Sequence, residues 1–123
     1  MELRMSSLPK TWILDLDGTI VKHNGYKIDG ADSLLPGAEN LLEQIGVEDC
    51  VIFVTSRKLE YKESTEDFLR KHAIRFDHII YEAPYGERIL INDKKPSGLP
   101  MAYAINTTRD ESEDIEIVID PTL

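Results

Sequence analysis

The sequence of 123 residues has little cysteine, few basic residues and no long uninterrupted apolar run. Its single cysteine, Cys50, excludes an internal disulfide and fits a reducing compartment, so we expect a cytoplasmic protein. Lys and Arg number 14 against 23 Asp and Glu, which gives a formal net charge of −9. This charge argues against nucleic acid or an anionic membrane as a partner, because both bind basic surfaces.

The lack of long apolar runs also bears on targeting and domain organisation. Residues 1–10 lack the apolar centre of a signal peptide, and the apolar run that follows is interrupted by Asp15. We therefore expect neither a signal peptide nor a transmembrane span. The length and the 41% hydrophobic content fit one soluble domain over residues 1–123, with residues 1–9 as a loose lead-in.

The most informative segment, residues 12–20, reads Trp-Ile-Leu-Asp-Leu-Asp-Gly-Thr-Ile. A short apolar run that ends at a glycine indicates a buried strand followed by a turn. Asp15 and Asp17 stand at the carboxyl end of this strand, where open α/β sheets bind ligands. Two such carboxylates need compensation, usually by a divalent cation. The alternative is that both aspartates only cap the turn.

The order of apolar runs and helical patterns predicts an α/β fold with a mainly parallel sheet. The expected strands are Lys10–Leu16, Cys50–Val54, Asp77–Tyr81, Arg88–Ile91 and Met101–Asn106, with a final apolar alternation at Ile115, Ile117 and Ile119. The expected helices are Pro36–Gly46 and Glu60–His72. Asn24-Gly25 between two short segments predicts a small β-hairpin flap just after the aspartates.

The DxDGT pattern formed by Asp15, Asp17, Gly18 and Thr19 resembles the first signature motif of the haloacid dehalogenase superfamily. The resemblance implies a Rossmann-like three-layer αβα sandwich and a Mg²⁺ cofactor. It also implies that Asp15 is a nucleophile that becomes an aspartyl-phosphate and that Asp17 is the general acid/base. A carboxylate nucleophile splits one difficult step into two, and a neighbouring acid can protonate the leaving oxygen.

The second predicted strand ends in Thr55-Ser56-Arg57, which is similar to a variant of the superfamily's second motif. The resemblance implies that Thr55 and Ser56, together with Gly18 and Thr19, bind the phosphoryl group. Arg57 is a candidate to bind substrate through its bidentate fork. The alternative is that Thr55 is a helix N-cap.

Residues 89–93 form a further apolar run that ends in Asn92-Asp93, as the fourth motif does. The resemblance implies that Asp93 binds Mg²⁺ together with Asp15 and Asp17, and the amide oxygen of Asn92 could also reach the ion. The alternative is an ordinary aspartate in a turn after a strand.

The third motif normally supplies a lysine between the second and fourth motifs, and no lysine follows the strand Asp77–Tyr81. Arg88 is the best replacement by order along the chain, although a solvated cation is an equally good interpretation. Lys94 and Lys95 flank Asp93 and could compensate, with Lys94 as a substrate-binding candidate. Residues 106–109 (Asn-Thr-Thr-Arg) follow another predicted strand and could line the rim of the site.

The intervals between these motifs leave no room for a cap domain, so the chain resembles a capless member. We therefore expect a Mg²⁺-dependent phosphomonoester hydrolase acting on a sugar phosphate or another small phosphorylated metabolite. An open site and an apolar final strand favour self-association into a homo-oligomer. The alternatives are a catalytically weak domain that binds a phosphorylated ligand or a partner protein, a phosphotransferase or mutase, and a receiver domain.

Overall fold

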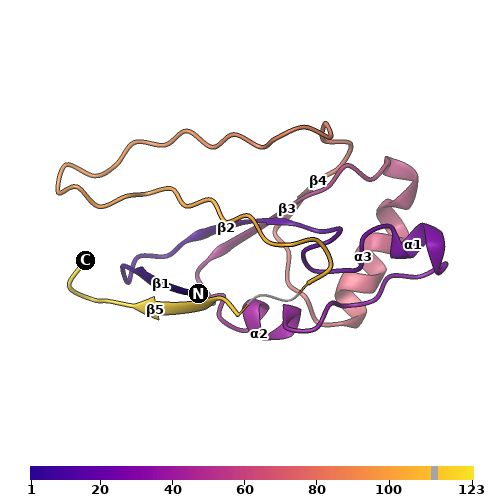
Figure 1. Cartoon of the computed structure of the whole chain (residues 1–123), viewed down its shortest axis with the longest axis horizontal. Coiled ribbons are helices and arrows are strands. Elements are labelled where there is room, and N and C mark those ends of the chain that lie inside the picture. The colour runs from indigo at the N-terminus through magenta and orange to yellow at the C-terminus, as the bar shows by residue number, and fades with distance from the viewer. Residues whose placement is uncertain (112–113) are drawn as a thin grey trace.

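The computed structural model describes residues 1–111 and 114–123, which form two small sheets and several short helices (Figure 1). The strands are β1 (Glu2–Met5), β2 (Thr11–Asp15), β3 (Cys50–Val54), β4 (His78–Ile80) and β5 (Glu116–Ile119). The helices are α1 (Gly25–Ile28), α2 (Ala38–Leu42) and α3 (Lys62–Lys71), and a 3-10 turn, η1 (Leu59–Tyr61), leads into α3. The three strand pairings of the described residues are parallel, so the fold is a small α/β fold as predicted.

The strand β3 lies at the centre of a three-stranded sheet of order β2-β3-β4. Asp15 pairs with Val54, and Val54 pairs with Ile80, so the three strands end at one edge. Parallel neighbours need crossover connections, which contain α2 between β2 and β3 and α3 between β3 and β4. The three strands predicted from the apolar runs at these positions are confirmed.

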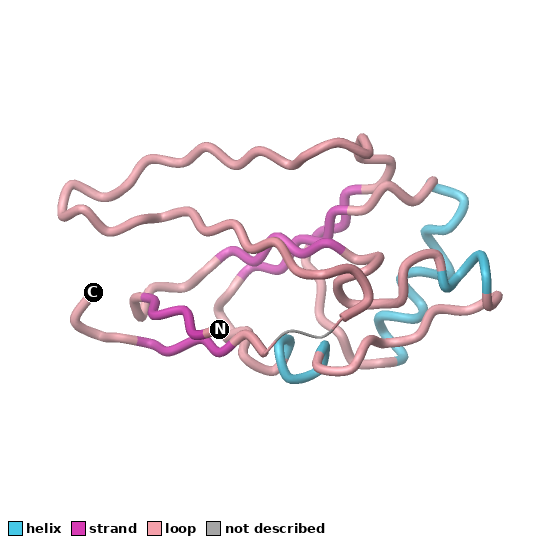
Figure 2. Tube along the Cα trace, viewed as in Figure 1, coloured by secondary structure: helices cyan, strands magenta, loops and turns pink. Residues whose placement is uncertain are grey.

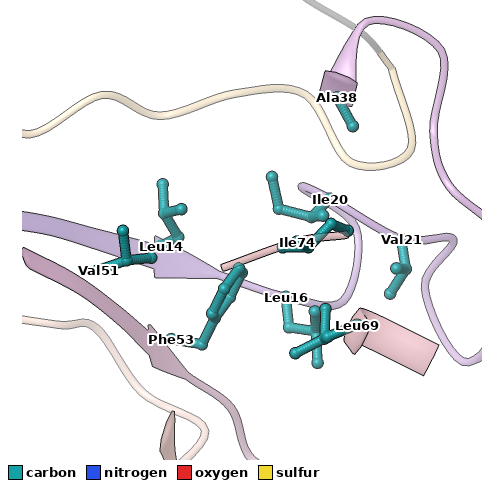
Figure 3. Packing of buried hydrophobic residues seen from close by; sticks show 9 residues of the cluster. All are labelled: Leu14, Leu16, Ile20, Val21, Ala38, Val51, Phe53, Leu69 and Ile74. Atoms are coloured by element: carbon teal, nitrogen blue, oxygen red, sulfur yellow. The ribbon is translucent and has the colours of Figure 1, made fainter. Parts of the chain in front are cut away.

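The hydrophobic core gathers side chains from β2, β3, α2, α3 and the loop after β2 (Figure 3). Val51 and Phe53 of β3 are fully buried, as are Ile20 and Val21 of the loop and Leu69 of α3. Each such side chain contributes roughly 1.5–3 kcal/mol through burial. The loop after β2 is therefore fixed by its own buried side chains, and this loop carries Asp17.

The two predicted helices form with different lengths. The expected helix Glu60–His72 is confirmed by η1 and α3 together. The expected helix Pro36–Gly46 is much shorter, because Gly37 takes a φ of 84° at its start and i+3 turns replace α-helix after Leu42. Among the helices of the described residues, none has the length and apolar character needed to cross a bilayer.

The prediction of a loose lead-in over residues 1–9 is wrong. β1 pairs in parallel with β5, with Leu3 opposite Ile117 and Met5 opposite Ile119. The alternation of the final isoleucines is thereby confirmed as a strand. The sequence Glu-Leu-Arg-Met of β1 has the same period of two, and this was the signal for the missed partner.

The predicted hairpin flap at Asn24-Gly25 is also wrong, because the chain forms the one-turn helix α1 there. A two-residue hairpin turn of type I′ needs positive φ at both central residues. Asn24 has a φ of 56°, but Gly25 is not among the residues with positive φ. Backbone N–H groups of Ile28 and Asp29 instead donate to the carbonyls of Asn24 and Gly25 at 2.9 and 2.8 Å.

The largest difference from prediction is the segment 86–107, which we call the arm. The predicted strands Arg88–Ile91 and Met101–Asn106 do not form, and every residue of the arm is described as loop or turn (Figure 2). Figure 1 shows the arm as two extended legs that run along the molecule without joining a sheet. At its tip, Gly98 N–H donates to the carbonyl of Lys95 at 2.8 Å.

Candidate active site

The aspartates lie at the shared carboxyl edge of β2 and β3. Asp15 is the last residue of β2, and the chain then turns sharply at Gly18, whose φ is 87°. The backbone N–H groups of Ile20 and Val21 both donate to the carbonyl of Leu16, at 3.0 and 3.1 Å. The predicted turn at Gly18 is confirmed, and this closed loop holds Asp15 and Asp17 in fixed positions.

Asp15 has one neutral and one cationic partner. The Thr19 hydroxyl donates to Asp15 Oδ2 at 2.9 Å, and Arg88 Nη1 donates to Asp15 Oδ1 at 2.8 Å. The side chains of Asp15 and Arg88 are 38% and 41% exposed, so a ligand can reach both. Arg88 therefore lies beside Asp15 at the candidate site and is not a solvated cation apart from it.

Asp17 binds a buried arginine. Arg57 donates to Asp17 from Nη2 at 2.8 Å and from Nε at 3.1 Å, and to Asp32 from Nη2 at 2.7 Å and Nη1 at 2.9 Å. Arg57 Nη1 also donates to the Thr65 hydroxyl at 2.9 Å. The Tyr26 ring centroid lies 4.0 Å from Arg57 Cζ, within range of a cation–π contact.

These contacts give Arg57 a different role from substrate binding. A guanidinium has five N–H donors, and here Asp17, Asp32 and Thr65 accept all five. The Arg57 side chain is 1% exposed. Burial lowers its pKa, but the hydrogen bonds and charges of Asp32 and Asp17 outweigh burial and raise the pKa above its usual value. Arg57 thus positions Asp17 and has no donor left for a ligand.

Thr55 and Ser56 follow β3 at the same edge. The Thr55 hydroxyl donates to Asp17 Oδ2 at 3.3 Å and accepts from Arg57 N–H at 3.1 Å. The alternative of an N-cap is wrong, because η1 begins only at Leu59. Thr55 is 1% exposed and supports the Asp17 cluster from inside, while Ser56 lines the cavity beside it.

A cavity of about 970 Å³ opens over this edge, lined by residues of β1, β2, the loop after β2 and the arm. Its described lining includes six cationic side chains: Lys10, Lys27, Arg57, Lys58, Arg88 and Arg109. The acidic side chains of that lining are Asp15, Asp17 and Glu87. Cationic side chains thus outnumber acidic ones in the described lining of a chain of net charge −9, which suits an anionic ligand.

The predicted metal ligands are only partly brought together. Asn92, Asp93 and Lys94 are exposed residues of the arm and do not line the cavity. Asn92 Nδ2 instead donates to the carbonyl of Asp93 at 3.0 Å. Within residues 1–111 and 114–123, no group of three or more His, Cys, Asp or Glu side chains could hold a metal ion. The described residues therefore do not gather the predicted ligands Asp15, Asp17, Asn92 and Asp93 in one place.

The sequence did not predict the roles of Asp32 and Tyr26, which both contact the Arg57 guanidinium. Asp32 lies in the loop before α2, and its side chain is 6% exposed. No motif or spacing marked it, because one aspartate between Ala31 and Ser33, two residues after a glycine, resembles any turn residue. Tyr26 belongs to α1, the segment that was predicted as a hairpin. A hairpin at that position gave no reason to expect the Tyr26 ring beside Arg57.

Comparison with known proteins gives a fold-level likeness. No family model and no curated protein matches the chain. One solved chain, from the structure of a Pnkp1/Rnl/Hen1 complex, is 31% identical over 69% of this chain, with a TM-score of 0.52. A chain from the structure of the Pnkp1/Rnl/Hen1 RNA repair complex is 32% identical over 69%, also with a TM-score of 0.52. This chain covers 32% and 29% of those chains, about a third of their length.

Proposed function

We propose that the chain is a phosphomonoester hydrolase of the haloacid dehalogenase type, with Asp15 as nucleophile. The observation that carries the proposal is the 2.8 Å contact of Arg88 Nη1 with Asp15 Oδ1. The order of the motifs along the chain predicts Arg88 as the replacement for the lysine of the third motif. That lysine would orient the nucleophile, and Arg88 contacts Asp15, the proposed nucleophile. A half-exposed carboxylate beside a cation, at the carboxyl edge of a parallel sheet, suits attack on a phosphoryl group.

The proposed reaction has two displacements at phosphorus. An Asp15 carboxylate oxygen bonds to phosphorus, the bond to the leaving alkoxide breaks, and a proton from the Asp17 carboxyl neutralises the alkoxide. Water then attacks phosphorus and gives its proton to Asp17, while the bond from phosphorus to Asp15 breaks. Arg57 and Thr55 hold Asp17 in place through both displacements. Arg88 offsets the negative charge that builds at the phosphoryl group.

We propose in addition that the activity needs Mg²⁺ and that the fold is a capless three-layer αβα sandwich. The order β2-β3-β4 with helical crossovers supports the sandwich. Magnesium is often held by one or two carboxylates together with substrate phosphate and water, and Asp15 could be such a carboxylate. Asp93 lies in the arm and does not line the cavity, so a need for Mg²⁺ does not imply that Asp93 binds it. Chelation by EDTA therefore tests the need for the metal, and Asp93→Asn tests Asp93 as its ligand.

The substrate proposed from the sequence is a sugar phosphate or another small phosphorylated metabolite. The two similar chains come from complexes named for Pnkp1, Rnl and Hen1, one of them described as an RNA repair complex. A phosphate at the end of an RNA strand is also a phosphomonoester. Short RNAs with a 3′- or 5′-phosphate therefore belong in the substrate panel, although the net charge of −9 opposes them.

The test is Mg²⁺-dependent release of inorganic phosphate from sugar phosphates, nucleotides, an aryl phosphate and phosphorylated RNA ends. The proposal expects release by the wild type, loss of release in Asp15→Asn, and loss on chelation. Release that survives in Asp15→Asn would contradict the assignment of Asp15 as nucleophile. Release that is insensitive to EDTA would contradict only the requirement for Mg²⁺.

A second candidate is a catalytically weak domain that binds a phosphorylated ligand or a partner protein. The incomplete set of metal-binding carboxylates among the described residues favours it. This candidate predicts that a phosphorylated ligand binds without release of phosphate. Calorimetric titration of the wild type with the same panel separates the two functions.

A further inference from the structure

We propose that Arg109 binds a second anionic group of the substrate, so that the site selects phosphomonoesters that carry another negative charge. The proposal rests on the proposed function in one respect, since it places the phosphoryl group at Asp15. Arg109 lines the same cavity as Asp15, Asp17 and Arg88. It lies just after the arm, at the rim of the site.

The position of Arg109 is fixed by the loop that carries the aspartates. The backbone N–H of Asp110 donates to the carbonyl of Gly18 at 2.9 Å, and the Asp110 carboxylate accepts from His23 N–H at 2.7 Å. A Cβ placed on Gly18 would lie 3.1 Å from Arg109 Cγ, so the stem of the arginine packs directly on this turn. Gly18 therefore leaves room for Arg109 between Asp17 and Thr19.

The three arginines of the cavity have different partners. Arg57 is saturated by Asp17, Asp32 and Thr65, and Arg88 binds Asp15. Over residues 1–111 and 114–123, no hydrogen bond or salt bridge engages the Arg109 guanidinium, although the chain has 23 acidic residues. An exposed, unpaired guanidinium with a fixed backbone is available to bind a carboxylate or a phosphate bidentately.

The separation of roles follows from these partners. Arg88 acts on the carboxylate that would react, so its removal affects the chemical step. Within the described residues, the Arg109 guanidinium makes no hydrogen bond or ion pair with either aspartate side chain, so we place it on a second group of the substrate. Binding energy from a remote group changes affinity for the substrates that carry this group and leaves other substrates unaffected.

The first experiment measures binding without turnover, in Asp15→Asn and in Asp15→Asn with Arg109→Gln. Three probes are titrated by calorimetry: glycerol 3-phosphate, 3-phosphoglycerate, which adds a carboxylate, and glycerol 1,3-bisphosphate, which adds a second phosphate. A charge-assisted hydrogen bond lost from a binding site weakens affinity about tenfold or more. We expect that loss for at least one of the two doubly anionic probes and less than about a threefold change for glycerol 3-phosphate. The probe that loses affinity shows whether the second group is a carboxylate or a phosphate.

The controls separate a specific contact from a change in net charge. Arg70→Gln removes one cation from α3 on a side chain that is 62% exposed and paired with Glu66, and should leave all three affinities unchanged. Arg109→Lys should restore part of the affinity that Arg109→Gln loses. Equal losses for all three probes, or no loss for any, would overturn the proposal.

Turnover then separates this proposal from the proposed function. If the probes bind and the wild type releases phosphate neither from them nor from the substrate panel, the phosphatase fails while the role of Arg109 is still decided by the affinities. If the wild type releases phosphate, Arg109→Gln should raise KM for the selected substrate about tenfold with little change in kcat. A loss confined to kcat would overturn the assignment to remote binding.

Discussion

The strand β3 and the first leg of the arm have similar apolar sequences and opposite environments. Val51 and Phe53 of β3 are 0% exposed, whereas Ile89 and Ile91 of the arm are 83% and 90% exposed. β3 pairs with a strand on each side. Within the described residues, no backbone hydrogen bond joins residues 88–92 to either sheet. An apolar run becomes a core strand only where neighbouring strands satisfy its backbone.

The two regions also contribute different residues to the candidate site. The sheet region supplies the carboxylates Asp15 and Asp17, fixed by buried side chains around them. The arm supplies Arg88, and the turn just after the arm supplies Arg109. A rigid scaffold that presents reactive groups to a less constrained loop is a common arrangement of enzyme sites. The salt bridge of Asp15 with Arg88 is therefore the contact that joins scaffold and arm.

Truncation of a large aromatic side chain should give the largest difference in stability between β3 and the region of the arm. Phe53→Ala should lower the free energy of unfolding by about 3–5 kcal/mol, because it leaves a cavity in the core. Tyr85→Ala is the matched control just before the arm, since Tyr85 is 85% exposed, and its effect should stay within about 0.5 kcal/mol. Urea titration of both variants measures the difference. Similar losses would contradict the contrast between core and arm.

Loss of a buried charge should come next. Asp32→Asn leaves the Arg57 guanidinium buried with one carboxylate fewer, and should cost about 3 kcal/mol of unfolding free energy. Asp29→Asn is the matched control, because the Asp29 side chain is 45% exposed and its pair with Lys22 is on the surface. Thermal and urea unfolding should show almost no change for the control. A small effect of Asp32→Asn would mean that the buried cluster is not formed in solution.

Removal of the contact between scaffold and arm should affect chemistry more than stability. Arg88→Gln should lower kcat about 100-fold, because charge on the phosphoryl group loses its neighbouring cation. The unfolding free energy should change by less than about 1 kcal/mol, since both partners are half-exposed. Arg70→Gln controls for net charge. An unchanged kcat in Arg88→Gln would return Arg88 to the role of a surface cation.

Patterns that are local in sequence were predictable. The apolar runs gave β2, β3 and β4, and the order of elements gave their parallel pairing. The helix over α3 followed from the apolar residues Tyr61, Phe68 and Leu69 of its segment. Asp15, Asp17 and Arg88, which were predicted from the first motif and from the order of the third along the chain, line one cavity, and their roles stay predictions.

Features that depend on distant partners were not predictable. β1 needs β5, which lies more than a hundred residues away in sequence, so its short alternation carried little weight alone. Asp32 acquires its role only from Arg57, which folding brings beside it. Two segments of the arm were predicted as strands from their apolar composition. Composition alone does not show whether another strand is present to form backbone hydrogen bonds with them. Propensity for strands is thus a preference that tertiary context decides.

Acid should destabilise the sheet region through Asp49, which lies just before β3. Burial raises the pKa of this carboxyl, but hydrogen bonds from Lys10 N–H, Trp12 Nε1–H and Gly46 N–H outweigh burial and lower the pKa. Because the folded pKa is below the unfolded one, the contribution to stability is present above the unfolded pKa, near 3.8, and is lost as the pH falls through the folded pKa. Urea titration at several pH values should show a shallower acid loss in Asp49→Asn, by about 1 kcal/mol. Parallel pH profiles would contradict this role.

The smallest effect is expected where the arm is most exposed. Ile91→Ser should change the unfolding free energy by less than about 0.5 kcal/mol, because a 90% exposed side chain loses little on truncation. Val51→Ser in β3 is the apolar-to-serine comparison in the core and should cost several times more. A loss above about 2 kcal/mol in Ile91→Ser would mean that the arm packs in solution, either on its own sheet or on a second copy. Packing on a second copy would make the unfolding midpoint rise with protein concentration, whereas packing within one chain would not.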